Sequence, residues 1–403
     1  MFRRGPEIKK KDSSVTKKEQ KSQQPLFTLT NKDETGFYFE NRFTETEGLN
    51  SLTYEYVYNG GGVAIGDINN DGLQDIFISG NNFGGGLFLN RGDLRFEDIT
   101  RSAGVLVKTP FVTGISMVDI NNDGYDDIYM CKSLDRDPKK RANVLLINNQ
   151  DLTFTDKADE YGLADESYSN YASFFDYDLD GDLDMYLLNH RHDFKVAANL
   201  KGHREKYGDV ARFGDTTYEY ISDRLYRNNG PGREFTDVTE KSGVLNWGYG
   251  LSATVGDINK DGYPDIFVAN DYSSKDNLYI NNGNGTFTDK LEEYVFHISK
   301  HSMGSDIADF NNDAQPDIVT LDMISEDNYR QKQLKWLSTY DLYHLFTESG
   351  LYHQVVRNTL QLNNGDGTFS EIGQLSGISH TDWSWSPLFA DYDNDGFKDI
   401  FIS

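Results

Sequence analysis

The sequence predicts an all-β protein, a β-propeller built from four-stranded antiparallel blades. Three observations lead to this fold class. A nine-residue aspartate-rich phrase recurs six times, each copy runs directly into a short β-branched and aromatic segment, and a second phrase with an Asn/Gly turn recurs between the copies. Internal units of roughly 50 residues that each supply four strands are typical of propeller blades.

The aspartate phrase reads D-x-[DN]-x-D-[GA]-x-x-D and predicts a calcium loop. A hard cation needs six or more oxygen ligands, and alternate carboxylates on a tight loop can converge on one point. Positions 1, 3, 5 and 9 would bind through side chains and position 7 through its carbonyl, which predicts about six structural Ca²⁺ ions. The predicted ligands are Asp67, Asn69, Asp71, Leu73 and Asp75; Asp119, Asn121, Asp123, Tyr125 and Asp127; Asp176, Asp178, Asp180, Asp182 and Asp184; Asp257, Asn259, Asp261, Tyr263 and Asp265; Asp309, Asn311, Asp313, Gln315 and Asp317; and Asp391, Asp393, Asp395, Phe397 and Asp399.

An EF-hand opens in the same way, but it closes with a glutamate at position 12 and lies between helices. Here position 12 is never glutamate, and the following residues, such as DIFI and DIYM, indicate strands. The other alternative is a set of solvated acidic turns without metal. Three or four carboxylates so close together repel one another strongly unless a cation lies among them, which favours the metal loop.

The fifth loop departs from the phrase, because Ala314 replaces the turn glycine. A side chain at a position that requires positive φ costs about 1 kcal/mol. We therefore expect the fifth loop to be the weakest calcium site.

Composition limits the classes of protein. The net charge of −26 argues against a nucleic-acid partner, whose phosphates the chain would repel. Cys131 is the only cysteine, so no disulfide within the chain is possible, and bound calcium would stabilise the fold in place of disulfides. Such loops are expected to fill where Ca²⁺ is abundant, which predicts an extracytoplasmic setting. No apolar stretch predicts a transmembrane segment, and residues 1–25 are basic and polar without the apolar core of a signal peptide; they are expected to be disordered.

The second phrase is an apolar strand, an Asn/Gly turn and then F-x-[DE], which predicts a β-hairpin. Each unit then contains two strands around the aspartate loop and two around this turn. The expected propeller domain spans residues 26–403, with repeats at about 61–100, 111–156, 170–237, 249–289 and 303–371 and a partial repeat at 385–403. Two connections between second and third strands carry insertions, at 189–223 and 322–358.

Five units are complete, and the sixth ends after its second strand at Ser403. The segment from Gly36 to Phe43 resembles a fourth strand and is expected to pair with the last blade. A full ring would then have about seven blades, and the incomplete sixth would present an exposed edge.

These repeats resemble the FG-GAP/VCBS family, the calcium-loop propellers related to the integrin α-subunit head. The resemblance covers residues 34–403, and the segment from Gly36, GFYFENRFTETEGLN, is further similar to bacterial VCBS proteins of the ASPIC/UnbV type; the C-terminal domain of that type is absent from this chain. The resemblance implies a structural metal in each blade and places the ligands on the six loops.

The aspartate loops must lie on one face of the disc, and both insertions on the other. All eight histidines and most tryptophans fall in connections on that other face, which suits a glycan or protein ligand. The candidate ligand-binding residues are His190, His192, His203, Trp247, His301, Trp336, His380, Trp383 and Trp385. They could equally be structural, and the second insertion could use Leu334, Trp336, Leu337 and Leu345 to pack a small helix of its own.

The leading hypothesis is a calcium-stabilised binding or adhesion module. One alternative is a carbohydrate-active enzyme, a polysaccharide lyase or hydrolase, on a propeller scaffold. The sequence favours the non-enzymatic function and predicts no catalytic residue, because the histidines near His190 lie on a short loop where neighbours point apart and no nucleophile or metalloprotease motif is present. The other alternative is a structural spacer in a larger surface protein.

Overall fold

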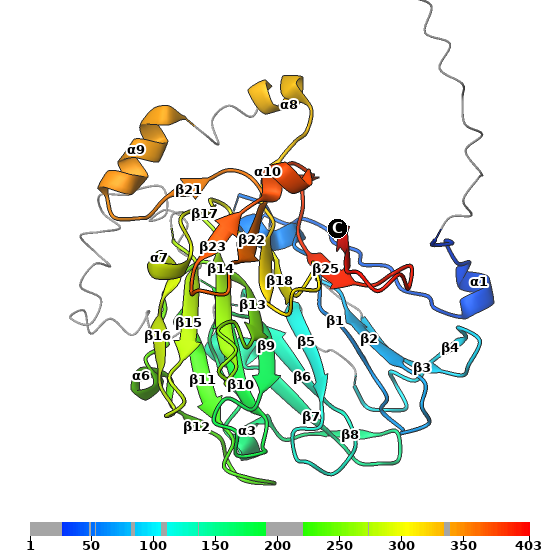
Figure 1. Ribbon diagram of the computed structural model, residues 1–403. Helices are drawn as coiled ribbons and strands as arrows, with labels where there is room; N and C mark the ends of the chain where they lie inside the picture. Colours follow the sequence, from blue (N-terminus) through cyan, green and yellow to red (C-terminus); the bar gives the residue numbers. More distant parts are fainter. Residues whose placement is uncertain are drawn as a thin grey trace, which may run out of the picture.

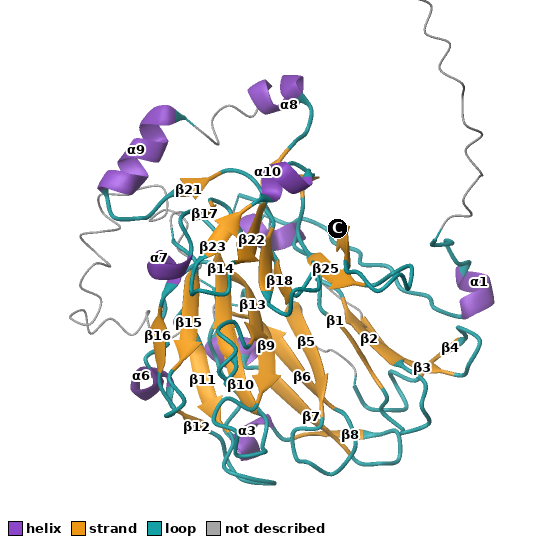
Figure 2. Ribbon diagram, viewed as in Figure 1, coloured by secondary structure: helices purple, strands orange, loops and turns teal. Residues whose placement is uncertain are grey.

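The computed structural model describes residues 26–47, 50–52, 54–81, 85–105, 111–135, 137–190, 221–272, 274–333 and 339–403. Within these residues the chain forms five four-stranded antiparallel sheets and a sixth sheet of two strands. Figures 1 and 2 show that strands dominate and that the first strands lie toward the middle of the molecule, with the fourth strands at its periphery. The predicted all-β fold with blade-like sheets is confirmed.

The sheets follow one another along the chain, and we number them one to six. Their strands are β1 Val63–Gly66, β2 Asp75–Ser79, β3 Gly85–Asn90 and β4 Phe96–Asp98; β5 Val112–Val118, β6 Asp127–Lys132, β7 Val144–Asn148 and β8 Phe154–Asp156; β9 Ser169–Phe175, β10 Asp184–Asn189, β11 Arg224–Arg227 and β12 Thr236–Asp237; β13 Gly250–Gly256, β14 Asp265–Asn270, β15 Asn277–Asn281 and β16 Phe287–Asp289; β18 Ser305–Ala308, β19 Asp317–Thr320, β22 Thr359–Asn363 and β23 Phe369–Glu371; and β25 Pro387–Ala390 and β26 Asp399–Ile402.

Short elements occupy the connections. Most four-residue helices follow a fourth strand, and α8 and α9 stand out from the sheets at the top of Figure 1. These elements are α1 Lys32–Thr35, η1 Glu55–Tyr58, α2 Pro138–Arg141, α3 Ala158–Tyr161, α6 Thr239–Ser242, α7 Leu291–Tyr294, α8 Asn328–Gln333, α9 Tyr340–Glu348 and α10 Gly373–Ser376, with two strand pairs, β17 Ile298–Ser299 with β21 Gln354–Val355, and β20 Met323–Ile324 with β24 Asp382–Trp383.

The hydrophobic core lies between neighbouring sheets. One cluster joins Phe77 and Leu87 of the first sheet to Ile115 and Ile128 of the second, and similar clusters join each later pair. Strands β6, β10 and β14 are consequently buried along their whole length, on both faces. In β26, by contrast, exposed and partly buried residues alternate, because only one face of the sixth sheet is covered by the fifth.

Hydrogen bonds between neighbouring first strands add to this packing. In the second to fifth sheets, the residue three places before the aspartate loop reaches the next first strand: for example, Ser116 Oγ donates to the Ala172 carbonyl at 2.7 Å, and Ser173 Oγ to the Ala253 carbonyl at 3.0 Å. Glycines allow the approach, since a Cβ on Gly114 would come within 2.3 Å of the Asn170 carbonyl oxygen. The first strands therefore converge at the end where they begin.

The segment expected to act as a fourth strand of the last blade does not do so. Residues 37–43 form no strand, and Phe37 packs instead against Phe88 and Phe96 of the first sheet, with ring centroids 4.5 and 5.9 Å apart. Earlier in the same segment, Phe27 contacts Tyr392 in the sixth loop at 5.7 Å. Residues 26–43 thus touch both the first and the sixth sheet through aromatic contacts, without joining a backbone ladder.

In four sheets, a buried hydrogen bond links the two ends of the connection between the second and third strands. The residue just before the third strand accepts a hydrogen bond from a backbone N–H at the end of the second: Asn143 from Lys132, Asp223 from Asn189, Asp276 from Asn270 and Asn358 from Asp322. The role is filled by asparagine in two sheets and by aspartate in the other two. Burial raises the pKa of Asp223 to about 7 and that of Asp276 to about 8.

We predict that Asp276→Asn stabilises the protein at neutral and alkaline pH. The folded carboxyl titrates at about 8 and an exposed one near 3.8, so the folded state binds more protons between these values and stability falls as pH rises through that window. Asparagine can keep the bond from Asn270 and donate to Ser302 Oγ, which now lies 3.0 Å from the carboxylate. The free energy of unfolding should be unchanged near pH 4 and higher by roughly 1–3 kcal/mol at pH 8.

Urea unfolding across this pH range measures the effect. The exposed Asp159→Asn is the control and should leave the pH slope unchanged. A variant at Asp276 that loses stability at pH 8 would contradict the prediction.

Candidate functional site

Each aspartate loop connects a first strand to a second strand, so all six loops lie at one end of the sheets. The carboxylate at position 1 shapes the loop by accepting two backbone hydrogen bonds. Asp67, for example, accepts the N–H of Asp71 at 3.1 Å and that of Gly72 at 2.8 Å. The same pair of contacts recurs in every copy, at 2.7 to 3.1 Å. The loop conformation therefore follows from the phrase itself.

The position 9 aspartates of the first five loops are buried, and each is held from two sides. Asp265 accepts the N–H of Ile258, in its own loop, at 2.8 Å and the N–H of Asn281, at the end of the third strand, at 2.7 Å. Burial raises the pKa of Asp127 and Asp184 to about 7 and that of Asp265 and Asp317 to about 6. An ionised carboxylate in such a position is desolvated, and a bound cation would compensate it.

The sixth loop differs at this position. Asp399 accepts the N–H of Tyr392 at 3.0 Å but is exposed, because no third strand covers it among the described residues. Asp391, Asp393 and Asp395 nevertheless bring one carboxylate oxygen each to within 4.8 Å of the others. The third strand is thus what buries the ninth residue, which the spacing of the phrase does not reveal.

The donor set fits a hard cation. Carboxylate, amide and backbone carbonyl oxygens line the loops, and these are the ligands that Ca²⁺ uses. In the third loop Asp176, Asp178 and Asp184 place oxygens within 4.8 Å of one another. Asp178 Oδ1 is buried and has no hydrogen-bond partner. An unsatisfied carboxylate oxygen that faces two other carboxylates is where a cation would bind, so the third loop carries the sharpest local indication of a metal.

The loop backbone confirms the strain expected at Ala314. Its φ is 66°, and the glycines at the same position have φ values between 85° and 95°. A Cβ added to those glycines would meet no atom within 4 Å, so the cost at Ala314 comes from the backbone and not from crowding. Position 4 is also left-handed in all six loops, for instance in Asn70 at 57° and Lys260 at 61°, which the sequence reading missed.

The other end of the sheets carries the connections, and we call it the connection face. The structure places the candidate ligand residues unevenly on it. His190 and His301 are buried, Trp247 and His380 are partly buried, and only Trp383 and Trp385 are exposed. The remaining three, His192, His203 and Trp336, lie outside the described residues, as does most of the insertion at 189–223. A single cluster of nine ligand residues is therefore not what the structure shows.

The buried histidines belong to an aromatic and acidic network around η1. Tyr56 donates its hydroxyl to Asp271, and His301 Nδ1 lies 2.8 Å from the other oxygen of that carboxylate. The Tyr56 ring meets His190 edge-on at 4.5 Å and Tyr272 at 6.2 Å. These contacts join η1 to the ends of β10 and β14 and leave His190 and His301 buried.

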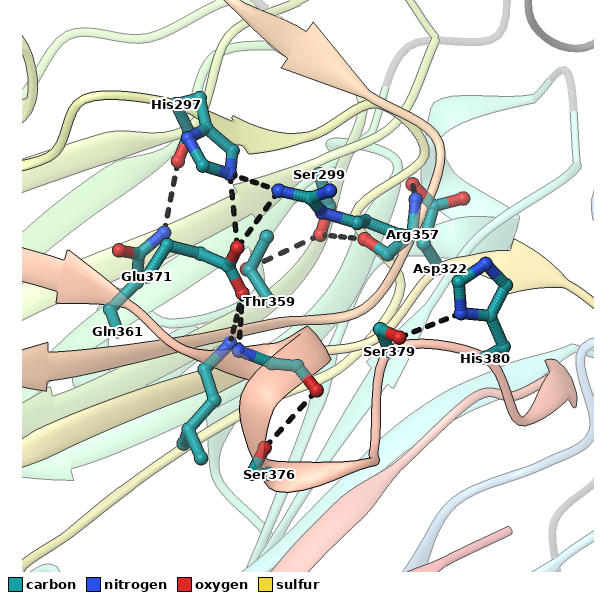
Figure 3. Close-up of polar contacts among 12 residues, drawn as sticks. His297, Ser299, Asp322, Arg357, Thr359, Gln361, Glu371, Ser376, Ser379 and His380 are labelled. Carbon is teal, nitrogen blue, oxygen red and sulfur yellow. Dashed lines mark hydrogen bonds and ion pairs between the residues drawn. The ribbon is translucent and has the colours of Figure 1, made fainter.

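A second polar network anchors the end of the insertion at 322–358. Figure 3 shows Arg357 and His297 converging on Glu371, with Arg357 to Glu371 at 2.9 Å and His297 Nε2 to Glu371 at 3.2 Å. Burial opposes ionisation of Glu371, yet hydrogen bonds from His297 and the Gly373 N–H and the charge of Arg357 together hold its pKa below the usual value. These contacts hold the end of the insertion against the fifth sheet.

A helix is present in the second insertion, as expected. In α9 Phe346 is buried, whereas Leu345 is 46% exposed. Leu334, Trp336 and Leu337 lie outside the described residues. The insertion is tied to the sheets by β20, whose Met323 pairs with Trp383 of β24. This pairing brings the insertion next to the exposed tryptophans.

Comparison with known proteins agrees with the repeats. A model of the family described as FG-GAP-like repeat matches residues 67–130, 209–268, 257–320 and 350–402, more than half of the chain. The chain belongs to this FG-GAP-like repeat family. Each matched range contains at least one of the aspartate loops, and only the third loop falls outside them. The narrower likeness to ASPIC/UnbV-type proteins stays an expectation.

Short stretches of this FG-GAP-like chain resemble curated proteins. Over 81 residues it is 40% identical to cartilage acidic protein 1 of Xenopus tropicalis, and over 72 residues 42% identical to the Homo sapiens protein of that name. These stretches cover 20% and 18% of this chain and only 12% and 11% of the two relatives.

Two solved structures show weak likeness. They are the V. cholerae biofilm matrix protein Bap1, at 12% identity and a TM-score of 0.41 over 82% of this chain and 41% of that chain, and 1,3Gal43A, an exo-beta-1,3-galactanase from Clostridium thermocellum, at 9% identity and 0.31 over 65% and 54%. TM-scores this low bear on neither fold nor function. Among the described residues, no helix has the length and apolar character needed to cross a membrane.

We predict that Ala314→Gly relieves backbone strain in the fifth loop. Glycine adopts positive φ without cost, so the variant should gain about 1 kcal/mol of stability and bind calcium at this loop about fivefold more tightly. Thermal melting in chelator and calorimetric calcium titration measure the two effects.

The matched control reverses the change in the fourth loop. Gly262 has a φ of 91° and open space around its missing Cβ, so Gly262→Ala should lose what Ala314→Gly gains. An Ala314→Gly protein with unchanged or weaker calcium binding would show that the fifth loop is not strained at this residue.

Proposed function

We propose that this chain is an extracytoplasmic, calcium-stabilised β-propeller module that binds a glycan or protein ligand through its connection face. In this proposal the six loops hold structural Ca²⁺ through the side chains at positions 1, 3, 5 and 9 and the carbonyl at position 7. The ion supplies positive charge that offsets the clustered carboxylates, and it takes no part in any reaction. Two observations support calcium binding: the loops offer only oxygen donors, and the buried Oδ1 of Asp178 has no hydrogen-bond partner.

The observation that carries the binding proposal is the exposure of Trp383 and Trp385 on the connection face. Their exposed fractions are 47% and 38%, whereas most aromatic rings of the sheets are buried. Trp383 is joined to the second insertion through β20 and β24, so the exposed rings and the inserted segment form one surface. Large rings with an apolar face and a polar edge are the groups most used for ligand contact.

The position of the acidic loops also supports binding at the connection face. The loops concentrate carboxylates at the opposite end of the sheets, where a ligand would compete with the cations. Location outside the cytoplasm follows from the same loops, because calcium is abundant there. The likeness to proteins named for cartilage is in keeping with this setting.

Removing calcium should lower the melting temperature by several degrees. An ion that binds only the folded state stabilises it by RT ln(1 + [L]/Kd), about 2.7 kcal/mol per site at a hundredfold excess over Kd. Differential scanning fluorimetry in EDTA and in millimolar CaCl2, with reversal by added calcium, measures the shift. Identical melting in the two buffers would contradict structural calcium.

Ligand binding should depend on the connection face. We expect the protein in millimolar calcium to bind members of an array of glycans and purified matrix proteins, and the double variant Trp383→Ala/Trp385→Ala to lose most of that signal. Leu94→Ala, which truncates a 61% exposed side chain in the turn after β3, at the loop end, is the control and should bind as the unmodified protein does. Full binding by the double variant, or none by the unmodified protein, would refute the proposal.

A further inference from the structure

A pocket of about 190 Å³ lies where the first strands of the sheets begin. The wall is formed by strand residues of the second, third and fourth sheets, Thr113, Asn170 and Leu251, and by residues that lie next to strands of the other three sheets, such as Trp385 just before β25. Since first strands run from the connection face toward the aspartate loops, the pocket belongs to the connection face. It is smaller than the roughly 300–1,000 Å³ of pockets for drug-sized ligands, which limits an occupant to one ring-sized group.

Tyr54 and Tyr56, which precede β1 in the chain, form one part of the wall. Both rings are buried, and the contacts of Tyr56 with Asp271 and His190 hold it in place. Asn81 is fixed as well, because its Nδ2 donates to the Val57 carbonyl at 2.9 Å. The wall is therefore formed before any ligand arrives, which lowers the entropy cost of binding.

Backbone strain occurs in the same wall. Phe111 has a φ of 64°, a left-handed conformation that bulky residues rarely adopt. Its N–H donates to the Asn81 carbonyl at 2.8 Å, and its carbonyl accepts from the Ser133 N–H at 3.2 Å. Backbone hydrogen bonds thus link Asn81, Phe111 and Ser133. These bonds keep Phe111 in its strained conformation in the pocket wall, and strained residues of this kind are common at binding sites.

The described part of the wall is neutral. Among the residues that the structure describes, no Asp, Glu, Lys, Arg or His lines the pocket, although the chain as a whole carries a net charge of −26. A charged ligand would lose its hydration there without gaining an opposite charge.

The polar groups that remain available are amides and an indole. Asn170 uses its Nδ2 on the Gly250 carbonyl at 2.7 Å, which orients its Oδ1. Among the described residues, Asn170 Oδ1, the Asn59 amide and the Trp385 indole N–H have no other hydrogen-bond partner, and the Trp385 ring is 38% exposed. The wall thus combines aromatic rings with uncharged donors and acceptors.

We propose that this pocket binds one neutral sugar residue of a glycan. A pyranose ring has an apolar face that can stack on Trp385 and a rim of hydroxyls that can bond to Asn59 and Asn170, and it carries no charge to desolvate. This inference rests on the proposed binding function of the connection face and names the site and ligand class within it.

The test compares Trp385 with an exposed residue at the loop end. Trp385 lines the pocket and is 38% exposed, whereas Leu94, in the turn after β3, is 61% exposed and lies at the opposite end of the sheets. Binding is measured by saturation-transfer NMR and calorimetry with methyl glycosides of glucose, galactose, mannose and N-acetylglucosamine, and with methyl glucuronide and methyl galacturonide as charged counterparts. We expect at least one neutral glycoside to bind, the uronides to bind more weakly, and Trp385→Ala to weaken binding about tenfold.

Leu94→Ala should change the affinity less than twofold, and Asn59→Ala should weaken it about threefold without a change in melting temperature. Stronger binding of the uronides, equal losses from Trp385→Ala and Leu94→Ala, or no binding of any neutral glycoside would overturn the inference. Binding to the array of glycans and matrix proteins distinguishes failure of this inference from failure of the proposed function. Array ligands lost in the double variant but retained by Trp385→Ala would place binding elsewhere on the connection face, and no array binding at all would remove both.

Discussion

The arrangement of the sheets depends on how the buried aspartate at position 9 of the first five loops is compensated. Asp127, Asp184, Asp265 and Asp317 are fully buried, and each accepts one N–H from its own loop and one from an asparagine at or just after the end of the third strand. A buried carboxylate is tolerated only when such donors or a cation surround it. The first, second and third strands must therefore assemble together for the loop to be satisfied.

The same asparagines join one sheet to the one before it. Asn148 Nδ2 donates to the Ile68 carbonyl of the first loop at 2.8 Å, and Asn281 and Asn363 make the equivalent bonds to Tyr177 and Ile258. Asn90 of the first sheet reaches only the Gln74 carbonyl of its own sheet. At the loop end, polar contacts of these asparagines thus link successive sheets from the first to the fifth.

Much of the fold could be predicted because the determining residues are close in sequence. The loop conformation, the strand that follows it and the hairpin turn all depend on contacts within about ten residues, and six copies of the phrase reinforce the interpretation. The expected fourth strand from Gly36 to Phe43 was wrong because Phe37 packs on Phe88 and Phe96, which lie more than 50 residues away along the chain, and Phe43 packs on Tyr58 and Phe111. No local sequence pattern distinguishes an aromatic segment that forms a β-strand from one whose rings only pack against a sheet.

By itself the sequence determined the repeat, the position of the oxygen donors, the strain at Ala314 and the separation of loops from insertions, since each follows from short-range geometry. Only the tertiary structure decided which histidines and tryptophans remain available. His190 packs against Tyr56 and His301 contacts Asp271, in each case a residue far away in the chain or from another sheet, and Trp385 is exposed at a pocket lined by residues from distant repeats. Burial is a property of what packs against a residue, and here those neighbours come from distant repeats that the residue's own sequence does not specify.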